Sequence, residues 1–253
     1  MASELTRLET VYLRGMRTVG VNSSFDGVST LAIDLVGTLI RKPTPDFYGV
    51  ALEFLHERGH RVSLDGFRRA FRKRYWEHSM GNYETDSEFY AALFADLSVP
   101  YDPSLEALTD IYLECSPAFP DVPQFLETTY QSYRLVLASN YVGRWAARIL
   151  ESNHWLTYFQ GSLVSSDCGF RKPSRQFFGE LLKIPEASPT EVLMIGDSLV
   201  NDAYGARIAG LRSVLLDREG TLDENSLGGS QSFASLHELR ASLLPERIES
   251  LPS

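Results

Sequence analysis

The chain has 253 residues, 43% of them hydrophobic and 23% charged, and its formal net charge at pH 7 is -9. These proportions are typical of a soluble globular protein of one or two domains. The negative charge disfavours nucleic acids and anionic membranes as partners. The two cysteines, Cys115 and Cys168, lie far apart, and positions 1–27 contain charged residues and no apolar segment of signal-peptide length. We therefore expect a cytoplasmic protein that binds neither nucleic acid nor membrane.

Residues 1–27 are predicted to form an N-terminal extension that precedes the first strand. Apolar residues at helical spacing before position 17 predict a short helix, and Asp26-Gly27 predicts a turn. Residues 31–39 then form an apolar run that contains the carboxylate of Asp34. Because the run is apolar on both faces, we expect a central strand in a sheet covered by helices, with Asp34 at its carboxyl end.

Residues 43–120 show only helical patterns. Capping residues or proline mark the predicted helix starts, at Thr44-Pro45, Ser63, Thr85 with Glu88 in capping-box spacing, and Pro103. No convincing strand interrupts these helices, so we expect them to form a compact unit of their own, a helical cap. The aromatic residues of this unit, Trp76 among them, are expected to form its core.

Strands and helices alternate after position 120. Apolar runs of strand length occur at 134–138, 161–165, 192–195 and 213–216, and the last of these is the final predicted strand. Strands separated by single helices predict a parallel, doubly wound Rossmann-like sheet of the α/β class. The predicted core therefore consists of residues 28–42 and 121–245, and the helical cap is inserted after its first strand.

Polar side chains follow several of these apolar runs directly. In chain order they are Asp34, Ser139, Lys172 and Asp197. The carboxyl ends of parallel strands meet at one edge of the sheet, where open α/β sheets bind ligands, so these side chains are expected to converge. Two carboxylates brought together favour a hard cation such as Mg²⁺, while a hydroxyl and an ammonium suit phosphate oxygens. The pattern indicates phosphoryl transfer.

Four motifs in this order resemble those of the haloacid dehalogenase superfamily. They read Asp34-Leu-Val-Gly-Thr38, Ser139-Asn140, Lys172-Pro173, and Gly196-Asp197 followed by Asp202. The resemblance covers residues 28 to about 240. It implies a Rossmann-like core with an inserted α-helical cap of the C1 type, and a hydrolase that acts on a small molecule, expected to be anionic.

The resemblance also implies roles for individual residues. Asp34 would be a nucleophile that forms a covalent aspartyl intermediate, and Lys172 would orient the transferring group. The implied cofactor is Mg²⁺, with ligands or supporting groups at Asp34, the backbone carbonyl of Val36, Asp197 and Asp202. The candidates for substrate contact are Thr38, Arg41, Ser139 and Asn140.

One position departs from the family pattern. Phosphatases of the family carry a second aspartate two residues after the nucleophile, where it acts as a general acid, and here that position is Val36. Loss of a general acid typically lowers the rate by about 10²–10⁴-fold. The favoured function is a Mg²⁺-dependent phosphatase for a small phosphorylated metabolite. The alternatives are a metal-independent 2-haloacid dehalogenase, whose halide leaves unprotonated, and a catalytically impaired scaffold.

Overall fold

The computed structural model of the chain describes residues 25–43, 46–223, 227 and 229–244. The predicted N-terminal helix, the Thr44-Pro45 helix start and the end of the tail lie outside these residues. Within them, no helix combines the length and the hydrophobicity needed to cross a lipid bilayer.

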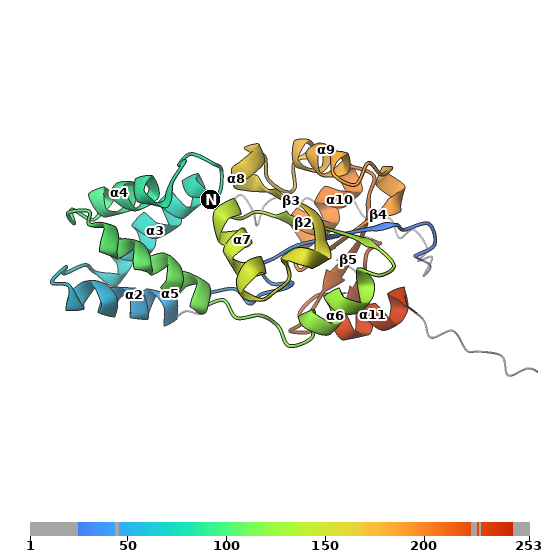
Figure 1. The fold of residues 1–253 in the computed structure, drawn as a ribbon, viewed down its shortest axis with the longest axis horizontal. Helices are drawn as coiled ribbons and strands as arrows, with labels where there is room; N and C mark the ends of the chain where they lie inside the picture. Colours follow the sequence, from blue (N-terminus) through green and yellow to red (C-terminus); the bar gives the residue numbers. More distant parts are fainter. Residues whose placement is uncertain (1–24, 44–45, 224–226, 228, 245–253) are drawn as a thin grey trace, which may run out of the picture.

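The centre of the molecule is a parallel sheet of six strands in the order β3-β2-β1-β4-β5-β6 (Figure 1). Its strands are β1 (Thr30–Ile33), β2 (Arg134–Ser139), β3 (Phe159–Val164), β4 (Val192–Gly196), β5 (Arg212–Leu216) and β6 (Gln231–Phe233). All residues of β1 are buried, as expected for the central strand of a covered sheet. The predicted doubly wound parallel fold is confirmed, but the prediction that the strand at 213–216 is the last was wrong, because β6 pairs with β5.

Helices cover both faces of the sheet. They are α6 (Val122–Thr129), α7 (Gly143–Ser152), α8 (Ser165–Cys168), α9 (Arg175–Lys183), α10 (Gly205–Ile208) and α11 (Leu236–Leu243). Figure 1 shows α9 and α10 on one face and α6 and α11 on the other. Successive side chains of a strand point to opposite faces, so Leu31 and Ile33 join one buried cluster while Ala32 joins another.

Strand register places the ends of the three central strands level with one another. Ile33, the last residue of β1, is opposite both Leu137 of β2 and Ile195 of β4. The chain remains in register for one more residue, because the Asp34 amide donates to the Ile195 carbonyl at 2.9 Å. The residues that follow these strands therefore meet at one edge of the sheet, as predicted.

Between β1 and β2 the regular elements among the described residues are helices, and the chain there forms no strand beyond isolated bridges at Val36–Ile40 and Ile40–Ala118. This part of the chain contains α2 (Asp46–Glu57), α3 (Leu64–His78), α4 (Asp86–Asp96), the 3₁₀ turn Pro103–Ala107 and α5 (Leu108–Glu114), here called the inserted helices. Ser63 and Thr85 cap α3 and α4 with their side chains, as predicted. The Glu88 carboxylate accepts from the Glu84 amide rather than from that of Thr85, so the reciprocal bond of the expected capping box is displaced by one residue.

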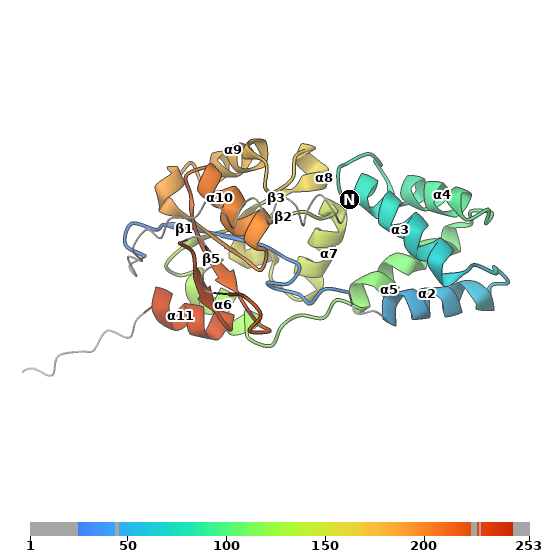
Figure 2. The same ribbon diagram turned by 180° about the vertical axis from the view of Figure 1, so that it is seen from behind.

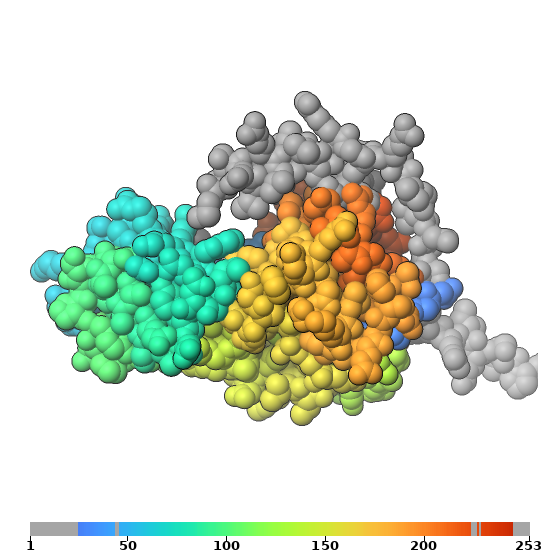
Figure 3. All heavy atoms as spheres, turned by 90° about the horizontal axis from the view of Figure 1, so that it is seen from above, coloured from blue at the N-terminus to red at the C-terminus, as the bar shows by residue number. Residues whose placement is uncertain are grey.

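The inserted helices lie beside the sheet, as both ribbon views show (Figures 1 and 2). Contact with the rest of the chain includes the end of α3, where the Ser165 hydroxyl donates to the Ser79 carbonyl at 2.6 Å. Gly81 lies so close to the Ser166 carbonyl that a Cβ would overlap it. Figure 3 shows the inserted helices lying directly against the rest of the chain. The division into a cap at 43–120 and a core around it stays a prediction.

Candidate functional site

Lys172 connects separate segments of the chain at the edge of the sheet where the carboxyl ends of the strands meet. Its ammonium donates to Asp34 Oδ1 at 2.8 Å, to Asp202 Oδ1 at 2.6 Å and to the Ala138 carbonyl at 2.7 Å. The side chain is only 2% exposed. Burial acts to lower the pKa of Lys172, but the carboxylates of Asp202 and Asp34 outweigh it and raise the pKa. Lys172 is therefore a fixed, charged group that contacts the predicted nucleophile.

Asn140 holds the backbone of Lys172 in place. Its side-chain amide donates to the Lys172 carbonyl at 2.9 Å, and its carbonyl oxygen accepts from the Lys172 amide at 2.8 Å. This pair fixes the loop after β3 against the end of β2. Asn140 was predicted to contact substrate, and it does line the pocket around Asp34, but its amide is already engaged in positioning Lys172.

Three carboxylates gather at this edge. One oxygen each of Asp34, Asp197 and Asp202 can be chosen so that all lie within 4.8 Å of one another. Glycines permit this approach: a Cβ on Gly37, whose φ is +90°, would overlap the Asp197 carboxylate, and one on Gly196 would overlap Asp202. Burial, and then the nearby charge of Asp34, raise the pKa of Asp197.

The donor set fits a hard divalent cation, because it consists of oxygens whose mutual repulsion a cation would relieve. Asp34 and Asp197 are the better candidates for direct ligation. Asp202 accepts from Lys172 with one oxygen and from the Ser198 amide, at 2.9 Å, with the other. Asp202 is therefore suited to support the site, in line with the role predicted for it.

A pocket of about 500 Å³ opens over these groups. Most of the predicted site residues line it, together with Lys42 and residues of the neighbouring loops: Asp34, Val36, Lys42, Ser139, Asn140, Arg171, Lys172, Asp197, Ser198, Leu199, Asn201, Asp202 and Leu222. The side chains available here are several carboxylates, among them the predicted nucleophile Asp34, and several cations. Such a set suits the transfer or hydrolysis of an anionic group.

A family model for haloacid dehalogenase-like hydrolases matches residues 28–210 of the chain. The chain belongs to the haloacid dehalogenase-like hydrolase family. The matched range includes all four motifs from Asp34 to Asp202, and with them most of the residues that line the pocket at the sheet edge.

Relatives within the family differ in the reactions named for them. A phosphoserine phosphatase of Thermus thermophilus is 32% identical over 103 residues, which are 40% of this chain and 41% of the relative. The crystal structure of YfnB from Bacillus subtilis bound to magnesium superposes with a TM-score of 0.63 at 21% identity, covering 86% of this chain and 98% of that one. A 2-haloacid dehalogenase of Pseudomonas syringae gives a TM-score of 0.67 at 21% identity, over 85% and 98% of the two chains. The two structures share the fold.

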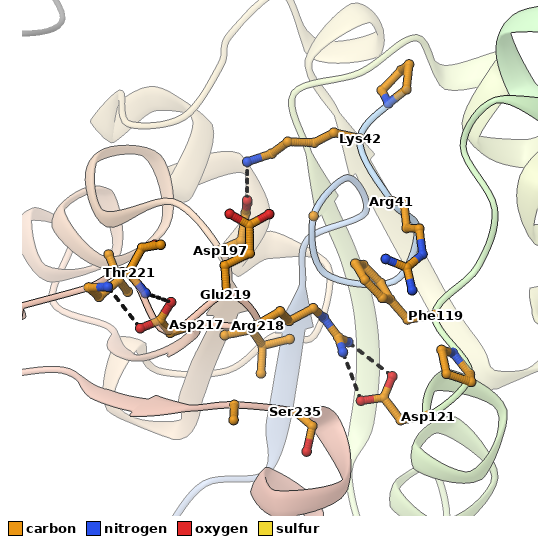
Figure 4. Close-up of a pocket in the computed structure, with 16 residues that line it drawn as sticks. Arg41, Lys42, Phe119, Asp121, Asp197, Asp217, Arg218, Glu219, Thr221 and Ser235 are labelled. Carbon is orange, nitrogen blue, oxygen red and sulfur yellow. Dashed lines mark hydrogen bonds and ion pairs between the residues drawn. The ribbon is translucent and has the colours of Figure 1, made fainter. Parts of the chain in front are cut away.

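Two residues that were predicted to contact substrate, Arg41 and Thr38, do not line the pocket around Asp34. Arg41 lines an adjoining cavity of about 770 Å³, which shares Lys42, Asp197 and Leu222 with the pocket around Asp34. Its guanidinium lies 4.7 Å from the centre of the Phe119 ring (Figure 4). Thr38 is fully buried, and its hydroxyl has no hydrogen-bond partner among the described residues. Its backbone carbonyl accepts from Arg218 at 2.9 Å.

Two further residues near the site carry a contact that the sequence patterns did not indicate. Trp76 was expected in the core of the inserted helices, but it is 46% exposed, and the Arg171 guanidinium lies over its ring. Lys42, the neighbour of Arg41, extends towards the site: its ammonium lies 2.7 Å from Asp197 Oδ2, as Figure 4 shows. The only sequence signal for Lys42 was its position directly after the first motif.

Lys42 neutralises a carboxylate that a metal ion would also use. Replacing it by methionine is expected to strengthen Mg²⁺ binding, because the ion then no longer competes with an ammonium for Asp197. The Lys42 side chain is 71% exposed, and an exposed pair contributes about 0.2–1 kcal/mol, which predicts a gain in affinity of up to about fivefold. Isothermal titration with MgCl₂ measures this directly.

The matched control for this titration is Lys73→Met. Lys73 forms a similarly exposed pair with Asp96, within the inserted helices. Its removal should leave the Mg²⁺ dissociation constant unchanged. An unchanged or weaker affinity in Lys42→Met would show that Lys42 and the ion do not compete.

Proposed function

We propose that this chain is a Mg²⁺-dependent phosphatase that acts on small, anionic phosphate esters through an aspartyl-phosphate at Asp34. The proposal rests on one observation above all, the presence of Asp34 and Asp197 in one pocket with the buried ammonium of Lys172. A metal-binding carboxylate and a fixed cation beside the nucleophile suit phosphoryl transfer, in which the protein positions the groups and offsets negative charge. The phosphoserine phosphatase relative supports this choice over part of the chain.

The metal would be held by Asp34, Asp197 and the backbone carbonyl of Val36, with Asp202 in support. When bound, Mg²⁺ would offset the negative charge of the carboxylates and of the phosphoryl oxygens. The chain's own residues have the remaining tasks. Ser139 lies on the pocket wall, and its hydroxyl, together with the Lys172 ammonium, is suited to hold phosphoryl oxygens.

Asp34 is oriented for attack by its contact with Lys172. The ammonium donates to Oδ1, which leaves Oδ2 available to form a bond to phosphorus while the bond from phosphorus to the ester oxygen breaks. The ester oxygen leaves with both electrons of the broken bond, as an alkoxide or aryl oxide, and an alkoxide then takes a proton from water. Water then attacks the aspartyl-phosphate, inorganic phosphate is released, and the carboxylate of Asp34 is restored.

Val36 limits the first of these steps. Val36 lines the pocket two residues after the proposed nucleophile, and its apolar side chain has no proton to donate to a leaving alkoxide. Leaving groups that need no proton should therefore be favoured, such as aryl oxides or the carboxylate of an acyl phosphate. Simple alkyl phosphates are expected to be slow substrates.

The proposal predicts hydrolysis of 4-nitrophenyl phosphate that depends on Mg²⁺. Excess EDTA should lower kcat/KM by about tenfold or more, because Asp34 and Asp197 would then repel both each other and the substrate. Addition of Mg²⁺ in excess of the chelator should restore the rate. Hydrolysis that is unaffected by EDTA would contradict the metal-dependent reaction.

A second candidate function, 2-haloacid dehalogenation, is favoured by the apolar side chain of Val36. A halide leaves without a proton, so the absence of a general acid at position 36 does not slow that reaction. The same preparation, incubated with 2-chloropropionate, distinguishes the two candidates. Chloride release that persists in EDTA, with no phosphate release from aryl esters, would replace the phosphatase proposal.

A further inference from the structure

We propose that Arg171 binds a second anionic group of the substrate, so that the preferred substrates are phosphate esters that also carry a carboxylate. The inference deepens the proposed phosphatase function and rests on it for the position of the phosphate. It concerns a part of the pocket that the Asp34, Lys172 and Asp197 groups do not occupy.

Arg171 belongs to the same pocket as the predicted nucleophile. It directly precedes Lys172 in the chain and lines the cavity together with Asp34 and Ser139. Lys172 directs its ammonium to Asp34, as described above. Because both residues line this one pocket, a ligand held beside Lys172 has Arg171 as a second positive group in the same cavity.

The inserted helices fix the position of this guanidinium. It lies 3.7 Å from the centre of the Trp76 ring on α3, and it donates to the hydroxyl of Ser79, which caps α3, at 3.3 Å. Stacking on an aromatic ring restrains the plane of a guanidinium while leaving donor groups at its edge for a ligand. Arg171 is therefore held by neutral partners on the other part of the molecule.

Arg171 differs from the other cations at this edge in lacking an acidic partner. Among the described residues, no carboxylate lies within 4.0 Å of it, whereas Lys42 pairs with Asp197, Lys172 with Asp34, and Arg218 with Asp121. Burial lowers the pKa of Arg171, which reflects the cost of holding its charge away from water. A cation that is partly desolvated and unpaired is stabilised when a ligand brings an anion.

A carboxylate is the group that best meets these conditions. The guanidinium forms charge-assisted, planar hydrogen bonds with a carboxylate, each worth about 1.5–3 kcal/mol. A neutral substrate of the same size would cover Arg171 without compensating its charge. The pocket should therefore discriminate between phosphate esters that differ only in an acidic group.

The test compares pairs of ligands on the Asp34→Asn protein in Mg²⁺, where turnover does not interfere. Phosphoglycolate is compared with ethyl phosphate, and 3-phosphoglycerate with glycerol 3-phosphate, by isothermal titration calorimetry. In at least one pair, the carboxylate should tighten binding by about tenfold to a hundredfold. Arg171→Met should abolish this preference, so that the two members of each pair bind about equally tightly, and Arg171→Lys should retain part of it.

Arg58→Met is the matched control. The Arg58 guanidinium also lies over an aromatic ring, 3.6 Å from the centre of Phe54, but it is outside the pocket. This variant should keep the full preference for the carboxylate. Circular dichroism melting curves confirm that each variant is folded.

The outcomes separate this inference from the proposed function. If neither carboxylate ligand binds more tightly than its neutral analogue, or if Arg171→Met keeps the preference, the role of Arg171 is overturned even when the wild type hydrolyses phosphate esters. If the wild type hydrolyses no phosphate ester, the phosphatase proposal fails whatever the titrations give. In an active enzyme, Arg171→Met should raise KM for the acidic substrates by a larger factor than KM for aryl phosphates.

Discussion

Val36→Asp is expected to raise kcat for alkyl phosphates by about 10²–10⁴-fold, the contribution typical of a general acid. Val36 is one of the residues that line the pocket containing Asp34, and aspartate is no larger than valine. The turn that carries it is held by the bond from the Gly37 amide to the Ile40 carbonyl, at 2.7 Å. Nearby carboxylates raise the pKa of an added carboxyl group, which favours the protonated form that donates to the leaving oxygen.

The comparison of leaving groups identifies the cause of any gain. Hydrolysis of 4-nitrophenyl phosphate should increase far less than that of ethyl phosphate, because the aryl oxide needs no proton. Val36→Asn is the matched control, since it has the shape of aspartate without its acid, and it should give no gain. If Val36→Asp leaves alkyl phosphates unreactive in a folded protein that binds Mg²⁺, the pocket is not assembled for phosphoryl transfer, and the impaired-scaffold alternative is favoured.

Asp34→Asn is expected to lower kcat on any phosphate ester by about 10⁴-fold or more, as is typical when an enzyme loses its nucleophile. An amide oxygen can still accept the bond from Lys172, so the arrangement around the pocket should persist. Lys172 also keeps its bond to Asp202, which leaves its ammonium compensated. The measurement is the steady-state rate on 4-nitrophenyl phosphate, together with a thermal melt in EDTA.

The same chemical change at the surface provides the control for this variant. Asp110→Asn alters a carboxylate that is 57% exposed on α5 and lies outside the pocket, and it should leave the rate as in the wild type. A folded Asp34→Asn protein that retained a tenth of the wild-type rate would show that Asp34 is not the nucleophile. The covalent intermediate and the roles assigned around it would then both be wrong.

Most of the sheet could be predicted because its strands are continuous apolar runs. β1, β2 and β4 lie in the middle of the sheet, and each contains the apolar sequence that burial on both faces requires. β6 gave no such signal, because it is a three-residue edge strand, Gln-Ser-Phe, with no fully buried residue. Its place is decided by backbone pairing with β5, which the sequence pattern does not record.

The site could be predicted as far as the positions of strand ends determine it. The carboxyl ends of parallel strands meet at one edge of a sheet, and this rule predicted that Asp34, Lys172 and Asp197 lie together. The structure places all three in one pocket. The direction of the side chains in the segment after β1 was not predictable. Lys42 reaches Asp197 while its neighbour Arg41 lies against Phe119, because adjacent side chains of an extended chain point to opposite sides.

In the inserted helices, the exposure of Trp76 was likewise not predictable from the sequence pattern. Trp76 is next to Tyr75, which is partly buried and packs against the core, so the sequence pattern did not decide which of these two aromatic side chains would be exposed. The exposure of Trp76 and its contact with Arg171 depend on how α3 meets the loop before α9. That contact is tertiary, between residues almost a hundred positions apart, and no local pattern reports it.

The three bonds of the Lys172 ammonium have a consequence for how the protein becomes active during synthesis. Asp34 is made early, but its ammonium partner follows 138 residues later, and Asp202 another 30 residues after that. A nascent chain of which only the first two thirds have been made contains Asp34 but neither Lys172 nor the carboxylates of Asp197 and Asp202, so the pocket cannot yet form. Enzymatic activity should arise only once the segment around position 202 has emerged, so the appearance of turnover would time the last stage of assembly.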